Sequence, residues 1–115
     1  MTITQELKQI LSMEQNFKCA KPSCFNRVDG ATGHAHHAIV PKGHTNYKKY
    51  KRLMDQPENL MIVCWQCDLQ HGDLTNHFMR LYFYSWKIDN NYKMAEWYAQ
   101  LSMDEEMFYI GKDGK

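Results

Sequence analysis

The chain has 115 residues, of which 43% are hydrophobic and 23% charged, with a formal net charge of +1. This length suits a single domain, residues 1–115, and this composition excludes an intrinsically disordered chain. No apolar run is long enough to span a bilayer, and the first residues lack the basic end and apolar block of a secretory signal. We therefore expect a cytoplasmic protein with no membrane partner.

Residues 1–17 predict an N-terminal helix. Thr4 is a suitable N-cap, and Leu7, Ile10 and Leu11 recur at helical spacing. We expect this apolar face to pack on the core of the domain.

Residues 18–72 form the central region. Residues 34–40 predict a strand that ends at Pro41, after which a loop runs to Asn59. Residues 60–63 predict a second short strand, and residues 64–71 predict a helix. Asp68 and His71 would then lie one turn apart on this helix, and Gly72 would break it.

The loop between the two predicted strands is basic and aromatic. Residues of this kind are suited to contacts with nucleic-acid phosphates, with the tyrosines packing on sugar or base. The alternative is a solvated helical turn that faces water. The residues concerned are Lys42, Tyr47, Lys48, Lys49, Tyr50, Lys51 and Arg52.

Residues 73–115 change in character and predict a helical extension. Ten of the fifteen aromatic residues of the chain fall between positions 78 and 109. We expect one helix over about 74–88, a second that ends near Leu101, and a short third helix after a capping box at residues 102–105. These aromatics belong to the core, or else form an exposed stripe that docks a partner.

Two pairs of cysteines lie far apart in the sequence: Cys19 with Cys24, and Cys64 with Cys67. In a reducing compartment such pairs hold zinc more often than they form disulfides. Four thiolates from two knuckles make a closed tetrahedral set, so we expect one structural Zn²⁺ that contributes to folding rather than to chemistry. The alternatives are buried thiols or a redox pair.

The segment from about Cys19 to His71 resembles the HNH endonuclease family. The resemblance is carried by His36-His37 before an apolar run, then Asn59-Leu60, then Cys64-x2-Cys67 and a possible metal ligand just beyond. It implies an α+β fold with a small ββα-metal core and a four-cysteine zinc site. The N-terminal helix and the aromatic-rich C-terminal helices would flank this core.

The resemblance also implies roles for particular residues. His37 corresponds to the general base and His36 to a ligand of a catalytic divalent cation. Asn59 matches the family's middle asparagine, which ties the intervening loop in place or contributes to the cation. Asp68 and His71 occupy the region of the last ligands, and an oxygen ligand there favours Mg²⁺ or Mn²⁺, whereas extra imidazole favours Zn²⁺ or Ni²⁺.

Two positions depart from the family's usual pattern. Asp68 stands where a histidine or asparagine commonly follows the second cysteine, and His71 comes one residue before the position of the second ligand, which is Gly72. The sequence leaves open which of Asp68 and His71 binds. His34 shares a strand face with His36 and could join the metal, contact DNA or be exposed.

These features predict a metal-dependent endonuclease that hydrolyses DNA phosphodiester bonds. An imidazole can take the proton of the attacking water at neutral pH, and the cation neutralises charge on the phosphate. The resemblance is compatible with a homodimer or with larger phage or mobile-element machinery in a bacterial host. The alternative is a non-catalytic, zinc-stabilised module that binds DNA or protein.

Overall fold

The computed structural model describes residues 3–41 and 47–101, and for Tyr47 and His71 it describes the backbone alone. The elements follow in the order α1 (Gln5–Glu14), β1 (His34–His37), α2 (Tyr47–Met54), η1 (Pro57–Asn59), β2 (Leu60–Val63), α3 (Trp65–Leu69), η2 (His71–Leu74), α4 (His77–Asp89) and α5 (Met94–Ala99). This mixture of helices with a small sheet is an α+β fold.

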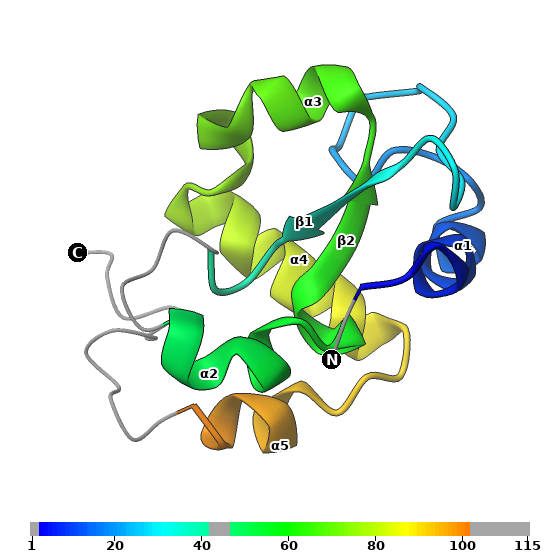
Figure 1. Cartoon of the computed structure of the whole chain (residues 1–115). Helices are drawn as coiled ribbons and strands as arrows, with labels where there is room; N and C mark the ends of the chain where they lie inside the picture. The colour runs from blue at the N-terminus through cyan, green and yellow to red at the C-terminus, as the bar shows by residue number, and fades with distance from the viewer. Residues whose placement is uncertain (1–2, 42–46, 102–115) are drawn as a thin grey trace.

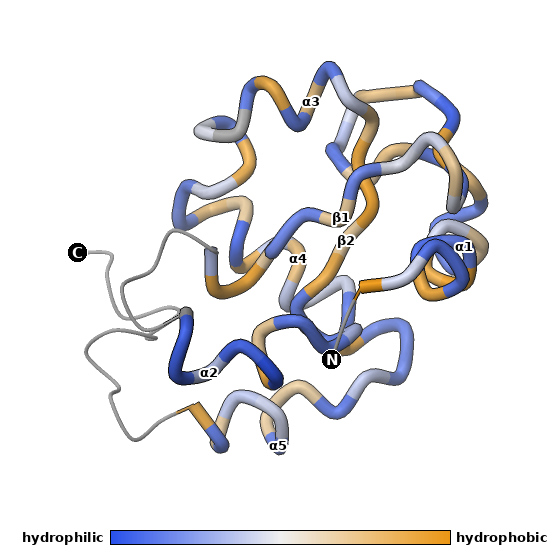
Figure 2. The backbone as a smooth tube through the Cα atoms, viewed as in Figure 1, coloured by the Kyte–Doolittle hydropathy of each residue, from blue (hydrophilic) through white to orange (hydrophobic). Residues whose placement is uncertain are grey.

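The sheet joins two segments that are distant in sequence. β1 and β2 run antiparallel, with His34 opposite Val63 and His37 opposite Leu60. Figure 1 shows the two strands at the centre of the molecule with α4 behind them. Every residue of β2 is buried, and Figure 2 shows this strand as a continuous apolar stretch. The second predicted strand is therefore confirmed, whereas the first ends at His37 instead of residue 40.

The predicted N-terminal helix is present as α1. Thr4 caps it, because its Oγ1 accepts a hydrogen bond from the backbone N–H of Leu7 at 3.1 Å. Leu11 is buried in the core, but Ile10 is 54% exposed, so the expectation that Ile10 faces the core was wrong. The helix ends where Asn16 and Phe17 adopt positive φ angles of 58° and 59°.

Gln15, directly after α1, attaches the helix to the sheet. Its Nε2 donates to the carbonyl of Ile62 at 2.9 Å, and its Oε1 accepts from the N–H of Ile62 at 2.8 Å. The amide therefore satisfies backbone groups of β2 as a third strand would. This pairing fixes the position of the loop that follows, which carries Cys19 and Cys24.

The segment predicted as a loop between the strands contains a helix. α2 spans Tyr47–Met54 with a kink at Tyr50 (φ −109°, ψ 20°), and η1 leads directly into β2. Figure 2 shows α2 as strongly hydrophilic. Lys51 and Asp55 are spaced i, i+4 and form an ion pair of 2.9 Å, which is a helix-stabilising arrangement that the loop prediction overlooked.

The helix predicted over residues 64–71 is interrupted. α3 ends at Leu69 because Gln70 leaves helical geometry (φ −99°, ψ 50°), and His71 begins the separate turn η2. Asp68 and His71 therefore do not share one continuous helix, and the break comes before Gly72. α4 begins at His77 instead of residue 74, because the side chain of Asn76 caps it through the N–H of Met79 at 2.9 Å.

The aromatic C-terminal region supplies part of the core. Phe83 and Trp97 are buried, while Phe78 and Tyr82 are exposed on α4. The indole N–H of Trp97 donates to the carbonyl of Leu53 at 2.9 Å and so attaches α5 to α2. The predicted third helix lies outside the described residues. Among the helices of 3–41 and 47–101, none has the length and apolar character needed to cross a membrane.

One charged residue of α4 lies inside the fold. Lys87 is 1% exposed, and its Nζ lies 4.2 Å from the centre of the Tyr92 ring and 5.5 Å from that of Trp86. Burial lowers the pKa of Lys87 to about 8, against the opposing effect of the charges of Glu14 and Glu58. The aromatic faces partly replace the water that the ammonium group loses.

Lys87 makes the stability of the fold depend on pH. Between about pH 8 and pH 10 the unfolded chain keeps this proton while the folded chain releases it, so the free energy of unfolding rises with pH. We expect the wild type to gain about 2 kcal/mol over this interval relative to Lys87→Met, measured by urea unfolding. The exposed Lys93→Met is the matched control. Parallel pH curves for wild type and Lys87→Met would contradict this assignment.

Candidate functional site

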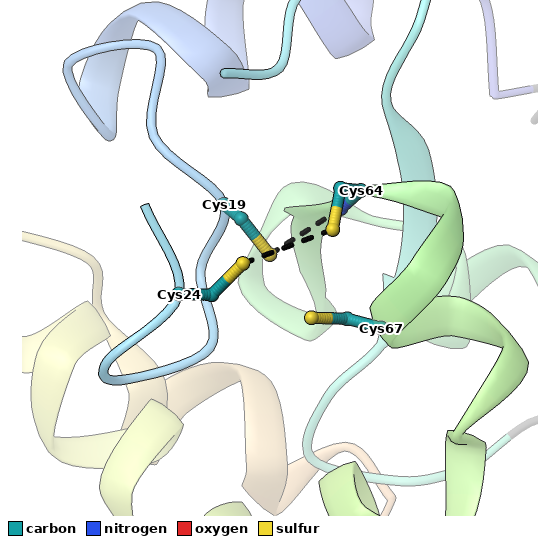
Figure 3. Close-up of side chains that lie close together, drawn as sticks. All are labelled: Cys19, Cys24, Cys64 and Cys67. Atoms are coloured by element: carbon teal, nitrogen blue, oxygen red, sulfur yellow. Dashed lines mark hydrogen bonds between the residues drawn. The ribbon is translucent and has the colours of Figure 1, made fainter. Parts of the chain in front are cut away.

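The four cysteines converge between the loop after α1 and the start of α3. Figure 3 shows their sulfur atoms pointing toward one another, Cys19 and Cys24 from the loop and Cys64 and Cys67 from the end of β2 and from α3. Their four Sγ atoms lie within 4.8 Å of one another, and none forms a disulfide. The predicted four-cysteine cluster is thus present, with the proximity that one metal ion requires.

The thiols of the cluster differ in their tendency to ionise. Burial opposes ionisation of Cys64, but hydrogen bonds from the Asn26 amide, the Cys67 backbone and neighbouring thiols lower its pKa to about 6. Burial, together with the crowding of the other sulfurs, raises the pKa of Cys67 above its usual range, and burial raises that of Cys19. A cation between the sulfurs would remove this penalty, because a metal binds thiolates and displaces their protons.

The donor set therefore fits a structural metal such as zinc. Four thiolates fill a tetrahedral shell and leave no position for a reacting water. The cluster also joins two distant parts of the chain, because Cys64 follows the last residue of β2 and its N–H donates to the Sγ of Cys19 at 3.3 Å. We infer that the ion stabilises the fold.

Metal removal tests this inference. We expect one zinc per chain by elemental analysis, and we expect a strong chelator to unfold the protein, because such a site contributes about 10 kcal/mol to folding. Cys67→Ser should lose the metal, while the exposed Ser85→Ala should keep it. A metal-free protein with an unchanged unfolding temperature would refute the site.

The paired histidines at the end of β1 point to different elements. The His36 ring meets Phe83 of α4 edge-on, with 6.1 Å between ring centres. The His37 Nε2 lies 2.7 Å from the Oδ1 of Asp55, just after α2. Both histidines are buried. Their divergence agrees with the alternation of side chains along a strand.

Asn59 closes the segment between the strands. Its Oδ1 accepts from the N–H groups of Ile39 and Val40 at 2.9 and 2.8 Å, and its Nδ2 donates to the carbonyls of Val40 and Met54 at 3.1 and 2.9 Å. The side chain is 0% exposed. Since both lone pairs of Oδ1 are used, this geometry matches the loop-tying role of the asparagine and not a contribution to a cation.

Asp68 and His34 meet at the other end of β1. The Asp68 Oδ2 lies 3.1 Å from the His34 Nδ1, with both side chains partly exposed. The side chain of His71, the other candidate ligand, lies outside the described residues. Among the described side chains, the four cysteines form a group of three or more potential ligands close enough to share one ion, and no such group contains His36 and Asp68.

The basic stretch lies on α2. Lys48, Lys49, Lys51 and Arg52 are exposed, but Lys51 pairs with Asp55. Tyr50 is buried, with the Lys49 Nζ 5.2 Å from its ring centre. The burial of Tyr50 therefore gives no support to its predicted packing on a sugar or base. Lys42 and the side chain of Tyr47 lie outside the described residues.

Sequence reasoning missed Asp55. It is buried and contacts both His37 and Lys51, although no motif includes it. The i, i+4 spacing from Lys51 was the available signal, but it indicates a helix rather than a partner for His37.

Compared with protein-family models, curated proteins and solved structures, this chain has no match.

Asn59→Ala tests the closure of the intervening segment. The substitution leaves backbone groups of residues 39, 40 and 54 buried without their partner, so we expect it to lower the free energy of unfolding by about 3 kcal/mol or more. Asn90→Ala removes an exposed side chain whose Nδ2 donates one hydrogen bond of 2.8 Å to the Trp86 carbonyl. This substitution should lower the free energy of unfolding by less than about 1 kcal/mol. Equal effects of the two variants in urea unfolding would contradict the role of Asn59.

Proposed function

We propose that this protein is a metal-dependent nuclease of the HNH type that hydrolyses DNA phosphodiester bonds, with His37 as the general base. The observation that supports the proposal is the order of β1, β2 and α3. His36 and His37 end the first strand beside Asn59, which directly precedes the second, and α3 with Asp68 follows at once. This order of two strands and a helix is compatible with the ββα core that the sequence resemblance implies.

Hydrolysis needs an activated water in line with the departing oxygen. A neutral imidazole has one nitrogen that carries a proton and one with a free lone pair. When the Nε2 of His37 donates to Asp55, Nδ1 is the ring nitrogen that carries the acceptor lone pair. The contact with Asp55 supports this role, because it would orient the imidazole of a general base.

A divalent cation would supply charge neutralisation on the phosphate and on the leaving oxygen. In this proposal His36 holds it together with Asp68, His71 or both. The donor chemistry fits, since imidazole with carboxylate suits Mn²⁺, Zn²⁺ or Ni²⁺, and a carboxylate with water suits Mg²⁺. The Asp68 side chain is partly exposed, and its Oδ2 already lies 3.1 Å from the Nδ1 of His34.

Helix α2 offers the contact surface for DNA. Lys48, Lys49 and Arg52 are exposed on it, and Asp55 at its end contacts His37. Phosphate contacts on α2 would therefore bring the DNA strand toward His37, the proposed general base. Such contacts depend on salt and carry little sequence information.

The decisive test is plasmid cleavage in the presence of Mg²⁺, Mn²⁺, Zn²⁺ and Ni²⁺ in turn. His37→Ala should lower the cleavage rate by about 10²-fold to 10⁴-fold, the usual contribution of a general base. The variant should keep its zinc and its unfolding temperature, which separates loss of chemistry from loss of fold. Full activity of His37→Ala would rule out the assigned role.

Binding without cleavage under every cation would favour the alternative of a zinc-stabilised DNA-binding module. In that case His36 and His37 would be structural. Absence of salt-dependent DNA binding would instead favour a protein-interaction domain that uses the exposed aromatic residues of α4.

A further inference from the structure

The contact between His37 and Asp55 is short and enclosed. The Nε2 of His37 and the Oδ1 of Asp55 are 2.7 Å apart, and the two side chains are 8% and 3% exposed. This is the length of a charge-assisted hydrogen bond, and water has little access to compete for it.

The second oxygen of the same carboxylate is also engaged. The Nζ of Lys51 donates to the Oδ2 of Asp55 at 2.9 Å, from a side chain that is 51% exposed. The positive charge beside Asp55 favours its ionised form. An ionised carboxylate accepts hydrogen bonds and donates none, so the proton in the contact with His37 belongs to the imidazole.

We propose that Asp55 is a positioning residue for His37. It holds the imidazole in one orientation and in the tautomer with the proton on Nε2, and Lys51 keeps the Asp55 carboxylate ionised. This inference rests on the proposed function for its effect on catalysis. The same logic operates in catalytic triads, where a buried aspartate fixes the tautomer of the base and stabilises the imidazolium that forms.

A purely structural role explains the arrangement less well. Buried ion pairs add little to stability, and apolar residues of similar volume would often serve as well. Here the carboxylate is fixed between an imidazole and an ammonium group that reaches the surface. Lys51 thus belongs to the basic stretch of α2 and also contacts Asp55, the residue that holds His37.

The tautomer can be measured without any substrate. In the zinc-loaded, ¹⁵N-labelled protein at neutral pH, correlation spectra of the imidazole should show His37 with its proton on Nε2. Asp55→Asn preserves shape but offers both a donor and an acceptor, so we expect a mixture of tautomers. The exposed Asp89→Asn should leave the His37 signals unchanged.

Cleavage kinetics give the second readout. We expect Asp55→Asn to lower kcat by about 10²-fold or more with little change in KM, since the isosteric change alters the base and not the DNA-binding surface. Asp89→Asn should behave as wild type. Lys51→Met should show a smaller loss of kcat and serves as the second variant if Asp55→Asn fails to fold.

The outcomes separate the two proposals. If the wild type cleaves DNA, and Asp55→Asn and Lys51→Met cleave as fast with His37 still in the Nε2–H form, the positioning role is wrong. A wild-type His37 with its proton on Nδ1 would also overturn it. If the wild type cleaves nothing under any cation, the proposed function fails, while the tautomer of His37 still decides whether Asp55 holds that ring.

Discussion

The amide of Asn59 is the constraint on which the centre of this fold depends. Its four hydrogen bonds tie the chain just after β1 and the end of α2 to the start of β2. The backbone of Asn59 also accepts from the N–H of Ala38 at 2.7 Å, which continues the pairing past the last residue of β1. Segments separated by some twenty residues are thereby held as neighbours, and the insertion between them can carry a helix without disturbing the strands.

The cysteine cluster makes the second closure, at the opposite end of β2. Asn59 precedes the strand and Cys64 follows it, so the four buried residues of β2 are fixed at both ends. Gln15 meets the middle of the strand from α1 through the backbone of Ile62. A chain of this size has a limited hydrophobic core. Buried hydrogen bonds and the cysteine cluster therefore help to specify a single conformation, which apolar packing alone would not.

Predictions from the sequence were correct for local features and failed where tertiary contacts determine the conformation. Thr4 as a cap and residues 60–63 as a strand follow from local sequence, and the structure contains both. The four-cysteine cluster joins distant segments, but the close spacing within each cysteine pair was enough to predict it. The insertion was predicted as a loop although Tyr50, Leu53 and Met54 recur at helical spacing and pack toward the core. The helix predicted after Cys64 was too long, because no glycine or proline between Cys64 and Gly72 indicates that α3 ends at Leu69. Asp55 was not found because its contact with His37 spans 18 positions and belongs to no motif.

The insertion therefore has more than one task. α2 presents its basic residues to solvent, and the same segment places Asp55 against His37 and Leu53 against Trp97 of α5. Burying the charge of Asp55 costs free energy, which the two flanking donors offset. Since Lys51 is half exposed while Asp55 and His37 are enclosed, an anion that drew Lys51 away would weaken the hold on Asp55. If α2 contacts a phosphate as proposed, that contact would be linked to the His37 ring through one carboxylate, because Asp55 lies within hydrogen-bonding distance of both Lys51 and His37.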